Sequence, residues 1–372
     1  MDNKNKIALI LKNVNELYEE YPGTTHGGGS VVNQNLYKEL FLEQNIFIDI
    51  YTFTPAKDIA QPANVNIIEI YKLIKPYDKQ KLIDYIDTQN YNKVITIHPA
   101  DIFRGRLLQS HSLLHRIRNS QLGIKIFKYI FLQKKIYNTK KIYKKLTSKD
   151  TFIAVSNKIK DDFAENFKIQ SSQIKVAYPG CKRIYPICPE VIKNDYPTFG
   201  IVANSAFNKG GHLFIAAAGI ANTILNKKFK IIMIAPKFKT DIFMKLLVNI
   251  YNLQNKITIL PKQKDMSYFY TNIDYLVLPS KNEAFGLVVL EAMSFGKPVL
   301  VSHTAGSREI VTYNNGFIFN RNSFSDLVKN IIYLTKVYYD DFDRYKNLSI
   351  NAYETSLKYS WKHFIEEILK EK

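Results

Sequence analysis

Short apolar runs alternate with helix-like segments along the whole chain. The runs are rich in Ile, Val, Leu and Tyr and are bounded by polar or turn-forming residues. They predict strands at residues 7–11, 46–53, 65–70, 94–97, 151–155, 174–177, 199–202, 230–234, 257–260, 274–278 and 299–302. Segments of helical length separate most of these runs, such as the one from Ser30, a suitable N-cap, to Leu42. This alternation favours an α/β fold with doubly wound parallel sheets.

A proline-rich stretch divides the alternation into two halves. Residues 179–197 hold prolines at positions 179, 186, 189 and 197, a composition typical of an interdomain linker. A chain of 372 residues is also long enough for two domains. We therefore expect one Rossmann-like domain over residues 1–185 and a second over residues 186–350. Ligands bind outside the carboxyl ends of strands in such sheets, so two facing domains would form a cleft for a donor and an acceptor.

The composition excludes some classes of protein. Hydrophobic residues make up 46% of the chain, which is enough for two ordinary cores, and no window approaches 18 uninterrupted apolar residues. The N-terminal residues lead into a strand and do not resemble a signal peptide. Cys181 and Cys188 are the two cysteines, and no metal-ligand cluster surrounds them in the sequence. We expect a reduced, cytoplasmic protein that does not span a membrane.

The net charge of +19 is unevenly distributed. Between Asp101 and Asp150 the sequence has 13 Lys and Arg and no Asp or Glu, and apolar residues interleave with the basic ones. A basic amphipathic region of this kind suits an anionic membrane surface, where each basic residue contributes about 1 kcal/mol. The alternatives are a solvated helix face or nucleic acid, although no nucleic-acid motif accompanies the charge. We expect the basic region 104–149 to bind the membrane and expect no nucleic acid partner.

The stretch from Asp274 to Pro298 carries the strongest chemical signal. An apolar run ends at Pro279-Ser280, a loop with Glu283 follows, and Phe285-Gly286 then opens an apolar helix that carries Glu291. The N-terminus of a helix offers unpaired N–H groups and positive dipole charge, and a glycine lets a ligand approach the backbone. This arrangement predicts a sugar-nucleotide site. The diphosphate would lie on the amides of Gly286, Leu287 and Val288, with a carboxylate on either side.

The same stretch resembles the signature of retaining glycosyltransferases of family 4, which have the GT-B fold. The matching residues are Pro279, Ser280, Glu283, Phe285, Gly286, Glu291, Ala292, Met293, Gly296, Lys297, Pro298 and Val299. The resemblance implies two Rossmann-like domains that face each other across a cleft. It also implies that Glu291 binds the ribose hydroxyls and Glu283 the hydroxyls of the donor sugar. Residues 351–372, with Ser360-Trp361, resemble the family's C-terminal helix, which packs back on the N-terminal domain.

Other donor-site positions also follow from the resemblance. Lys209, in Asn208-Lys209-Gly210-Gly211, is similar to the family's lysine on the donor diphosphate. Many relatives have Gly-Arg after the preceding strand, whereas this chain has Ala203-Asn204 there. One of the two usual phosphate cations is therefore missing at Asn204, so that Lys209, or a lysine such as Lys237, would have to suffice. Gly27 and Gly28 are similar to the glycine pair that approaches the donor from the first domain.

Three further residues are candidates for the acceptor side of the cleft. His111 is similar to the histidine that in relatives lines the place where donor sugar and acceptor meet. His98 ends the strand predicted at residues 94–97, and Asp101 follows it closely. Both are candidates for holding the acceptor hydroxyl.

The sequence argues against a metal cofactor. Glycosyltransferases of the other major fold hold a divalent ion with an Asp-x-Asp pair that follows a strand. Asp341-Phe342-Asp343 has this pattern here, but it lies in a polar, helical C-terminal region. A helix dipole together with Lys209 can take the place of the ion.

These observations together predict a metal-independent, retaining glycosyltransferase at the cytoplasmic face of the membrane. It would move a hexose from a nucleotide diphosphate sugar, with a UDP-sugar favoured, to a lipid-linked or surface glycan. The catalytic candidates are Glu283, His111 and Lys209. Because fold does not fix function, a sugar-nucleotide epimerase of the same fold and a non-catalytic, membrane-binding relative remain as alternatives.

Overall fold

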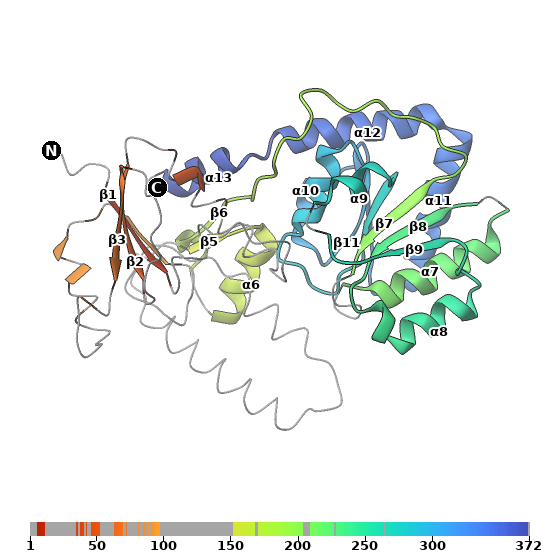
Figure 1. The fold of residues 1–372 in the computed structure, drawn as a ribbon, viewed down its shortest axis with the longest axis horizontal. Helices are drawn as coiled ribbons and strands as arrows, with labels where there is room; N and C mark the ends of the chain where they lie inside the picture. Colours follow the sequence, from red (N-terminus) through yellow and green to blue (C-terminus); the bar gives the residue numbers. More distant parts are fainter. Residues whose placement is uncertain are drawn as a thin grey trace, which may run out of the picture. The chain divides into compact units, whose positions relative to one another are not determined.

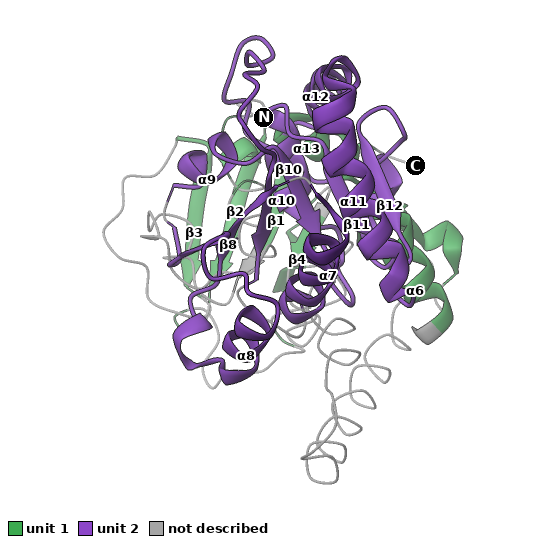
Figure 2. Cartoon of the chain, turned by 90° about the vertical axis from the view of Figure 1, so that its right-hand side faces the viewer, with its two compact units in different colours: residues 1–21, 26–178, 361–372 green, residues 22–25, 179–360 purple. Residues whose placement is uncertain are grey.

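The structure, a computed structural model, divides into two compact units (Figures 1 and 2). Unit 1 comprises residues 1–21, 26–178 and 361–372, and unit 2 comprises residues 22–25 and 179–360. The residues that it describes are 6–11, 35, 38–40, 42, 46–52, 63–69, 72, 81, 85, 86, 88, 89, 91, 93–96, 152–167, 170–203, 209–226, 228–263 and 265–370.

Unit 1 contains a four-stranded parallel sheet with the strand order β3-β2-β1-β4. The bounds are β1 Lys6–Leu11, β2 Phe47–Thr52, β3 Val65–Glu69 and β4 Lys93–Thr96. A second, two-stranded parallel sheet pairs β5 (Phe152–Ala154) with β6 (Ile174–Val176), and α6 (Asn157–Phe167) connects them. The C-terminal helix α13 (Trp361–Leu369) also belongs to this unit, where the Lys175 ammonium donates to the Lys370 carbonyl at 3.2 Å.

Unit 2 contains a six-stranded parallel sheet with the strand order β12-β11-β10-β7-β8-β9. Its strands are β7 Thr198–Val202, β8 Lys230–Ile234, β9 Ile257–Leu260, β10 Tyr275–Leu278, β11 Val299–Ser302 and β12 Gly316–Phe319. This is the doubly wound order of dinucleotide-binding sheets, in which the direction of winding reverses between β7 and β10. The carboxyl ends of these two central strands are therefore the expected place for a ligand.

Helices cover both faces of the sheet in unit 2, as Figure 1 shows for α7 and α8 below it and α10 and α12 above it. The helices are α7 Gly211–Ile224, α8 Ile242–Ile250, α9 Ser267–Thr271, α10 Leu287–Ser294, α11 Phe324–Asp340 and α12 Phe342–Leu357. Short 3-10 turns span Ser171–Gln173, Phe238–Thr240 and Gly306–Ile310. The main core joins strand residues such as Phe199 and Tyr275 to the inner sides of α7, α8 and α11. This core fixes the loops at the carboxyl ends of the strands.

The α/β, doubly wound fold expected from the sequence is confirmed, and each of the eleven predicted strands has a counterpart within two residues of its predicted ends. The strand β12 (Gly316–Phe319) was not predicted. In the structure, the main boundary between the two compact units follows Tyr178, whereas the sequence placed the first domain boundary after Tyr185. They also assign residues 351–360 to unit 2, so that only residues 361–372 of the expected C-terminal helical segment lie with unit 1.

Candidate donor site

The candidate site lies at the reversal point of the unit 2 sheet. Lys209 follows β7, and Glu283 follows β10, so the parallel sheet presents both at its carboxyl edge. Helix α10 begins just after Glu283 and carries Glu291. Lys209, Glu283 and Glu291, which the sequence assigned to the donor, thus all lie in unit 2, after two neighbouring strands and on one helix.

Gly286 makes the sharp turn that opens α10. Its φ is 100°, in the left-handed region that favours glycine. A Cβ at this position would lie 2.8 Å from Leu278 Cδ2 and 3.2 Å from Glu283 Cγ, so a larger residue would have to displace its neighbours. The Gly286 carbonyl accepts from the Val289 amide at 2.9 Å, whereas the amides of Leu287 and Val288 precede the first intrahelical bonds. The turn therefore leaves backbone donors without intrahelical partners at the positive end of a helix, in residues of which Gly286 and Leu287 are buried.

The second glycine of the site follows Lys209. Gly210 has a φ of 73°, and a Cβ there would lie 2.1 Å from the Pro279 carbonyl oxygen. The loop after β7 consequently packs directly against the loop after β10. This close approach brings Lys209 within reach of Glu283.

Lys209 and Glu283 form an ion pair between the Lys209 Nζ and Glu283 Oε2 atoms. The Ser280 hydroxyl lies 3.4 Å from the same carboxylate oxygen. The backbone of Glu283 is also held, because its carbonyl accepts from the Gly306 amide at 3.0 Å and it bridges to Ala305. The lysine side chain is 31% exposed, whereas that of Glu283 is 11% exposed. A fixed carboxylate thus holds a cation that solvent, or a ligand, can reach.

Glu291 has a different environment, one turn inside α10. Its Oε2 atom accepts a hydrogen bond from the Tyr270 hydroxyl at 2.5 Å. Burial raises the pKa of this carboxyl above its usual value, and the hydrogen bond from Tyr270 opposes that shift. Burial and the neighbouring carboxylate also raise the pKa of Tyr270, so the tyrosine stays a donor. One oxygen of Glu291 is therefore oriented by the protein, and a carboxylate has lone pairs left to accept from a ligand hydroxyl.

Glu291 also affects the nearby thiol of Cys181. Burial, and secondarily the charge of Glu291, raise the pKa of Cys181 to about 12. This cysteine stays protonated at neutral pH and is therefore not an activated nucleophile.

Phe285 packs inside the protein beside the candidate site. Its side chain is fully buried, and its carbonyl accepts from the Ser307 amide at 2.8 Å. The sequence placed Phe285 in the donor-binding set, and the structure gives it a packing role beneath the loop.

Two residues near the site were not singled out from the sequence. Tyr270 lies 21 positions before Glu291 on the short helix α9, and only the fold brings the two together. Arg321 follows the unpredicted strand β12, and its Nε atom donates to the Pro279 carbonyl at 3.1 Å. Arg321 thereby holds the loop that leads to Glu283.

Several predicted residues lie outside the part of the chain that the structure describes. They are Gly27, Gly28, His98, Asp101, His111 and Asn204, together with the basic region 104–149. Their assignment to the donor, the acceptor and the membrane stays a prediction.

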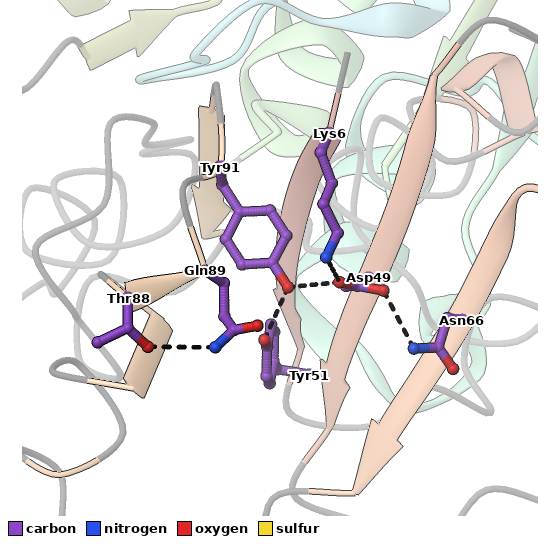
Figure 3. Close-up of polar contacts among 7 residues, drawn as sticks. All are labelled: Lys6, Asp49, Tyr51, Asn66, Thr88, Gln89 and Tyr91. Atoms are coloured by element: carbon purple, nitrogen blue, oxygen red, sulfur yellow. Dashed lines mark hydrogen bonds and ion pairs between the residues drawn. The ribbon is translucent and has the colours of Figure 1, made fainter. Parts of the chain in front are cut away.

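Unit 1 has a polar cluster of its own, shown in Figure 3. Asp49, in the middle of β2, pairs with Lys6 at 2.9 Å and accepts hydrogen bonds from Tyr91 at 2.5 Å and from Asn66 at 3.1 Å. The Tyr91 hydroxyl also lies 2.8 Å from the Tyr51 hydroxyl. The cluster crosses the sheet face near the amino ends of β1 and β2, away from the edge where doubly wound sheets bind ligands.

The described residues contain no candidate metal centre. Among them, no three or more His, Cys, Asp and Glu side chains form a group that could hold a metal ion. Asp341 caps α12 by accepting from the Arg344 amide at 3.1 Å, so the Asp-x-Asp sequence there starts a helix. Within the described ranges, no helix is both long and apolar enough to cross a bilayer.

Comparison with solved structures identifies the fold. Solved glycosyltransferase structures share the GT-B fold over the whole chain. WaaG, a glycosyltransferase involved in lipopolysaccharide biosynthesis, superposes with a TM-score of 0.66 over 97% of this chain and 98% of its own, at 14% identity. Anabaena Alr3699/HepE in complex with UDP and glucose gives a TM-score of 0.67 over 98% of both chains, at 17% identity. At these identities the similarity establishes the fold alone.

The sequence match is to part of the chain. Residues 189–355 match the family Glycosyl transferases group 1. An uncharacterised glycosyltransferase of Methanocaldococcus jannaschii is 30% identical over 231 residues, which are 60% of this chain and 59% of that relative. The matched part covers 26% and 21% of two other curated relatives, so the chain spans less than two thirds of the length of each of these proteins.

Proposed function

We propose that this protein is a retaining glycosyltransferase of family 4 that transfers a hexose from a UDP-sugar to a lipid-linked or surface glycan. The observation that carries the proposal is the Lys209–Glu283 ion pair at the reversal point of the sheet, next to the N-terminus of α10. A cation, a carboxylate and helix-terminal amides at one edge suit a ligand that has both phosphates and hydroxyls.

The donor diphosphate would bind the amides at 286–288 and the Lys209 ammonium. Lys209 already points at this edge because Glu283 holds it, so little side-chain entropy remains to be lost on binding. The phosphates then compete with Glu283 for the ammonium. A carboxylate that is released in this way becomes able to accept from the hydroxyls of the donor sugar. The same pair would thus switch from an internal contact to two ligand contacts.

Glu291 would bind the ribose hydroxyls. The Tyr270 hydroxyl donates to one oxygen of the carboxylate and so sets the orientation of its second oxygen. Because burial raises the pKa of Glu291, a ribose hydroxyl that donates to the charged form is favoured more strongly as the pH rises above that pKa.

The transfer step needs charge stabilisation more than a protein nucleophile. Negative charge grows on the diphosphate as the sugar leaves, and Lys209 with the dipole of α10 would stabilise it. In retaining enzymes of this type the leaving phosphate deprotonates the acceptor on the same face of the sugar. His111 would line this place, and His98 and Asp101 would hold the acceptor hydroxyl. No metal ion enters the scheme.

Two comparisons support the choice of substrates. HepE was solved with UDP and glucose, and WaaG acts in lipopolysaccharide biosynthesis. The 13 basic residues between 101 and 150 would hold the enzyme on the anionic cytoplasmic face of the membrane, where a lipid-linked acceptor is accessible.

A screen of nucleotide sugars tests the proposal directly. The full chain is incubated with each donor, and thermal stabilisation, donor hydrolysis and the anomeric form of the product are measured with and without a chelator. We expect one UDP-sugar to stabilise the protein, and its hydrolysis to persist in the chelator. Glu291→Ala should weaken UDP binding by about 10- to 100-fold, the value of a hydrogen bond to a charged group.

The control and the contrary outcomes separate the alternatives. Glu354→Ala removes an exposed glutamate of α12 and should leave UDP binding unchanged. A donor whose sugar is epimerised without transfer would favour an epimerase, and a protein that binds vesicles but no nucleotide sugar would favour a non-catalytic relative. Loss of activity in chelator that added metal restores would contradict the metal-independent scheme.

A further inference from the structure

The outer side of α8 (Ile242–Ile250) presents a row of large apolar side chains. Ile242, Leu246 and Ile250 follow each other at helical spacing and are 80%, 50% and 59% exposed, and the neighbouring Phe243 is 48% exposed. Figures 1 and 2 show α8 at the periphery of unit 2. These four residues are called the α8 row below.

The α8 row is not needed to hold the helix in place. Met244 and Val248 on the opposite side are buried in the core of unit 2, and Leu247 packs against that core. The Asp241 carboxylate caps the helix by accepting from the Met244 amide at 2.9 Å. Phe243 packs on the His212 ring, with 5.1 Å between the ring centroids, whereas Ile242, Leu246 and Ile250 are at least half exposed. Such an exposed row, on a helix that is already anchored, indicates an interaction surface.

The charge beside the row restricts its partner. Lys239 and Lys245 are exposed next to the α8 row, and neither takes part in an ion pair among the described residues. Asp241 is the only acidic residue between positions 236 and 251, and its carboxylate also lies 3.2 Å from His212 Nε2. The surface therefore combines exposed apolar side chains with a positive flank. An interfacial helix on an anionic membrane has this combination.

A second copy of the chain fits the surface less well. A nine-residue helix is about 14 Å long, and four side chains on it cannot supply the roughly 800 Å² per partner of a stable dimer. Each copy would also bring the same two lysines and the same net charge of +19 to the contact. A lipid surface requires no complementary shape and attracts the lysines.

We propose that the α8 row inserts into the interface of an anionic lipid membrane, with Lys239 and Lys245 at the level of the headgroups. The row begins at Ile242, which follows β8 at the carboxyl edge of the sheet, the same edge that carries Lys209 and Glu283. Attachment through α8 therefore holds the donor-binding edge of unit 2 close to the lipid. The α8 row lies outside the basic region 104–149 in the sequence, and its proposed role does not depend on the proposed transfer reaction.

Flotation of the full chain with vesicles tests the proposal without donor or acceptor. The vesicles contain phosphatidylglycerol and phosphatidylethanolamine, and phosphatidylcholine vesicles serve as the uncharged comparison. Ile242→Ser with Leu246→Ser should lower partitioning into the anionic vesicles by about tenfold or more, because each buried CH₂ group contributes about 0.8 kcal/mol. Lys239→Gln with Lys245→Gln should lower it several-fold and only on the anionic vesicles.

The matched control is Ile187→Ser. Ile187 is 75% exposed, close to the 80% of Ile242, but it lies outside α8, so partitioning should not change. The substituted residues Ile242, Lys245 and Leu246 of α8 and Lys239 of the preceding turn are exposed, and circular dichroism with thermal melting should show an intact fold. Charge reversal at Lys134, Lys135, Lys140 and Lys141 forms a separate arm that tests the basic region.

Two results would overturn the proposal. In the first, the α8 variants partition like the unmodified chain while the charge reversal releases it, which leaves membrane attachment to the basic region alone. In the second, sedimentation shows a dimer that the Ile242 and Leu246 substitutions abolish while vesicle binding is unchanged, which assigns the row to a second copy.

Discussion

The two units each contain a lysine–carboxylate pair, and the two pairs differ in their surroundings. In unit 1 the Asp49 carboxylate pairs with Lys6 and also accepts from Tyr91 and Asn66 (Figure 3). Asp49 lies within β2, so its backbone is part of the sheet. In unit 2 the Glu283 carboxylate pairs with Lys209, and the glutamate lies in the loop between β10 and α10. The unit 1 pair is thus part of its sheet, whereas the unit 2 pair lies in loops at the carboxyl edge of a different sheet.

The difference shows how similar chemistry can serve stability or binding. Tyr91 and Asn66 bind both oxygens of Asp49, and a ligand that displaced them would have to replace charge-assisted hydrogen bonds. Burial and the hydrogen bond to Asp49 raise the pKa of Tyr91 far above its usual value, which keeps the tyrosine protonated as a donor. Lys209 is held by Glu283 beside the N-terminus of α10. In the proposed function a diphosphate would exchange with Glu283 there, in a loop outside the sheet.

Removing the lysine of the unit 2 pair is expected to have the largest effect. Lys209→Met keeps the length of the side chain but removes the cation on the leaving diphosphate. We expect the rate of transfer from the UDP-sugar to fall by about 10²- to 10³-fold, the usual loss for one electrostatic contact to the transition state. Steady-state kinetics and UDP titration measure the effect on turnover and on affinity separately.

Lys6→Met is the matched control for this variant, because it removes the lysine of the other pair. It should lower the stability of unit 1 and leave UDP affinity unchanged. If Lys209→Met transfers sugar at the normal rate, the ion pair is structural and the comparison between the two pairs fails. Lys209→Arg should keep part of the activity because it keeps the charge.

The sequence singled out Lys209 and Glu283 as separate site residues, but it predicted neither their ion pair nor the unit 1 network. Strands β8 and β9 coincide with their apolar runs, and the loops that follow β7 and β10 place Lys209 and Glu283 by topology alone. The strand β12 has only four residues, begins with a glycine and exposes Ile318, so its pattern is too short to stand out. Tyr91 and Tyr270 were missed because tyrosines are frequent here, and only tertiary packing selects which of the 25 meets a carboxylate.

A third carboxylate, Asp274, is buried without a lysine in direct contact. It tests whether such burial makes the charged form of a carboxylate unfavourable for stability. Asp274 precedes β10, where its oxygens accept from the Thr198 amide at 2.8 Å and the Tyr345 hydroxyl at 3.1 Å. Burial raises its pKa to about 6, against the opposing effects of the Thr198 hydrogen bond and Lys297. The folded protein therefore holds the proton more tightly than the unfolded chain, whose ordinary value is 3.8. Stability from this group is complete below pH 3.8 and is lost as the pH rises through 6.

Asp274→Asn removes that titration. Relative to this variant, the unmodified protein should lose about 2.5 kcal/mol of unfolding free energy between pH 4 and pH 7, from a shift of about two pKa units. Urea unfolding across this pH range measures the difference between the two proteins. Asp343→Asn, at a side chain that is 89% exposed, should show no such slope. A constant difference across the range would mean that Asp274 is charged in both states.

Substitution of Asp49 is expected to give the smallest effect, and it tests the structural half of the comparison. Asp49→Ala removes the acceptor of Tyr91 and Asn66 and leaves Lys6, whose side chain is 31% exposed and can reach water. We therefore expect a loss of about 2 kcal/mol, below the cost of a fully buried unpaired charge. Thermal unfolding should show this loss, and UDP affinity should stay as in the unmodified protein. A variant of normal stability that no longer binds donor would place Asp49 in the binding machinery, and the sheet position of a lysine–carboxylate pair would then say nothing about its role.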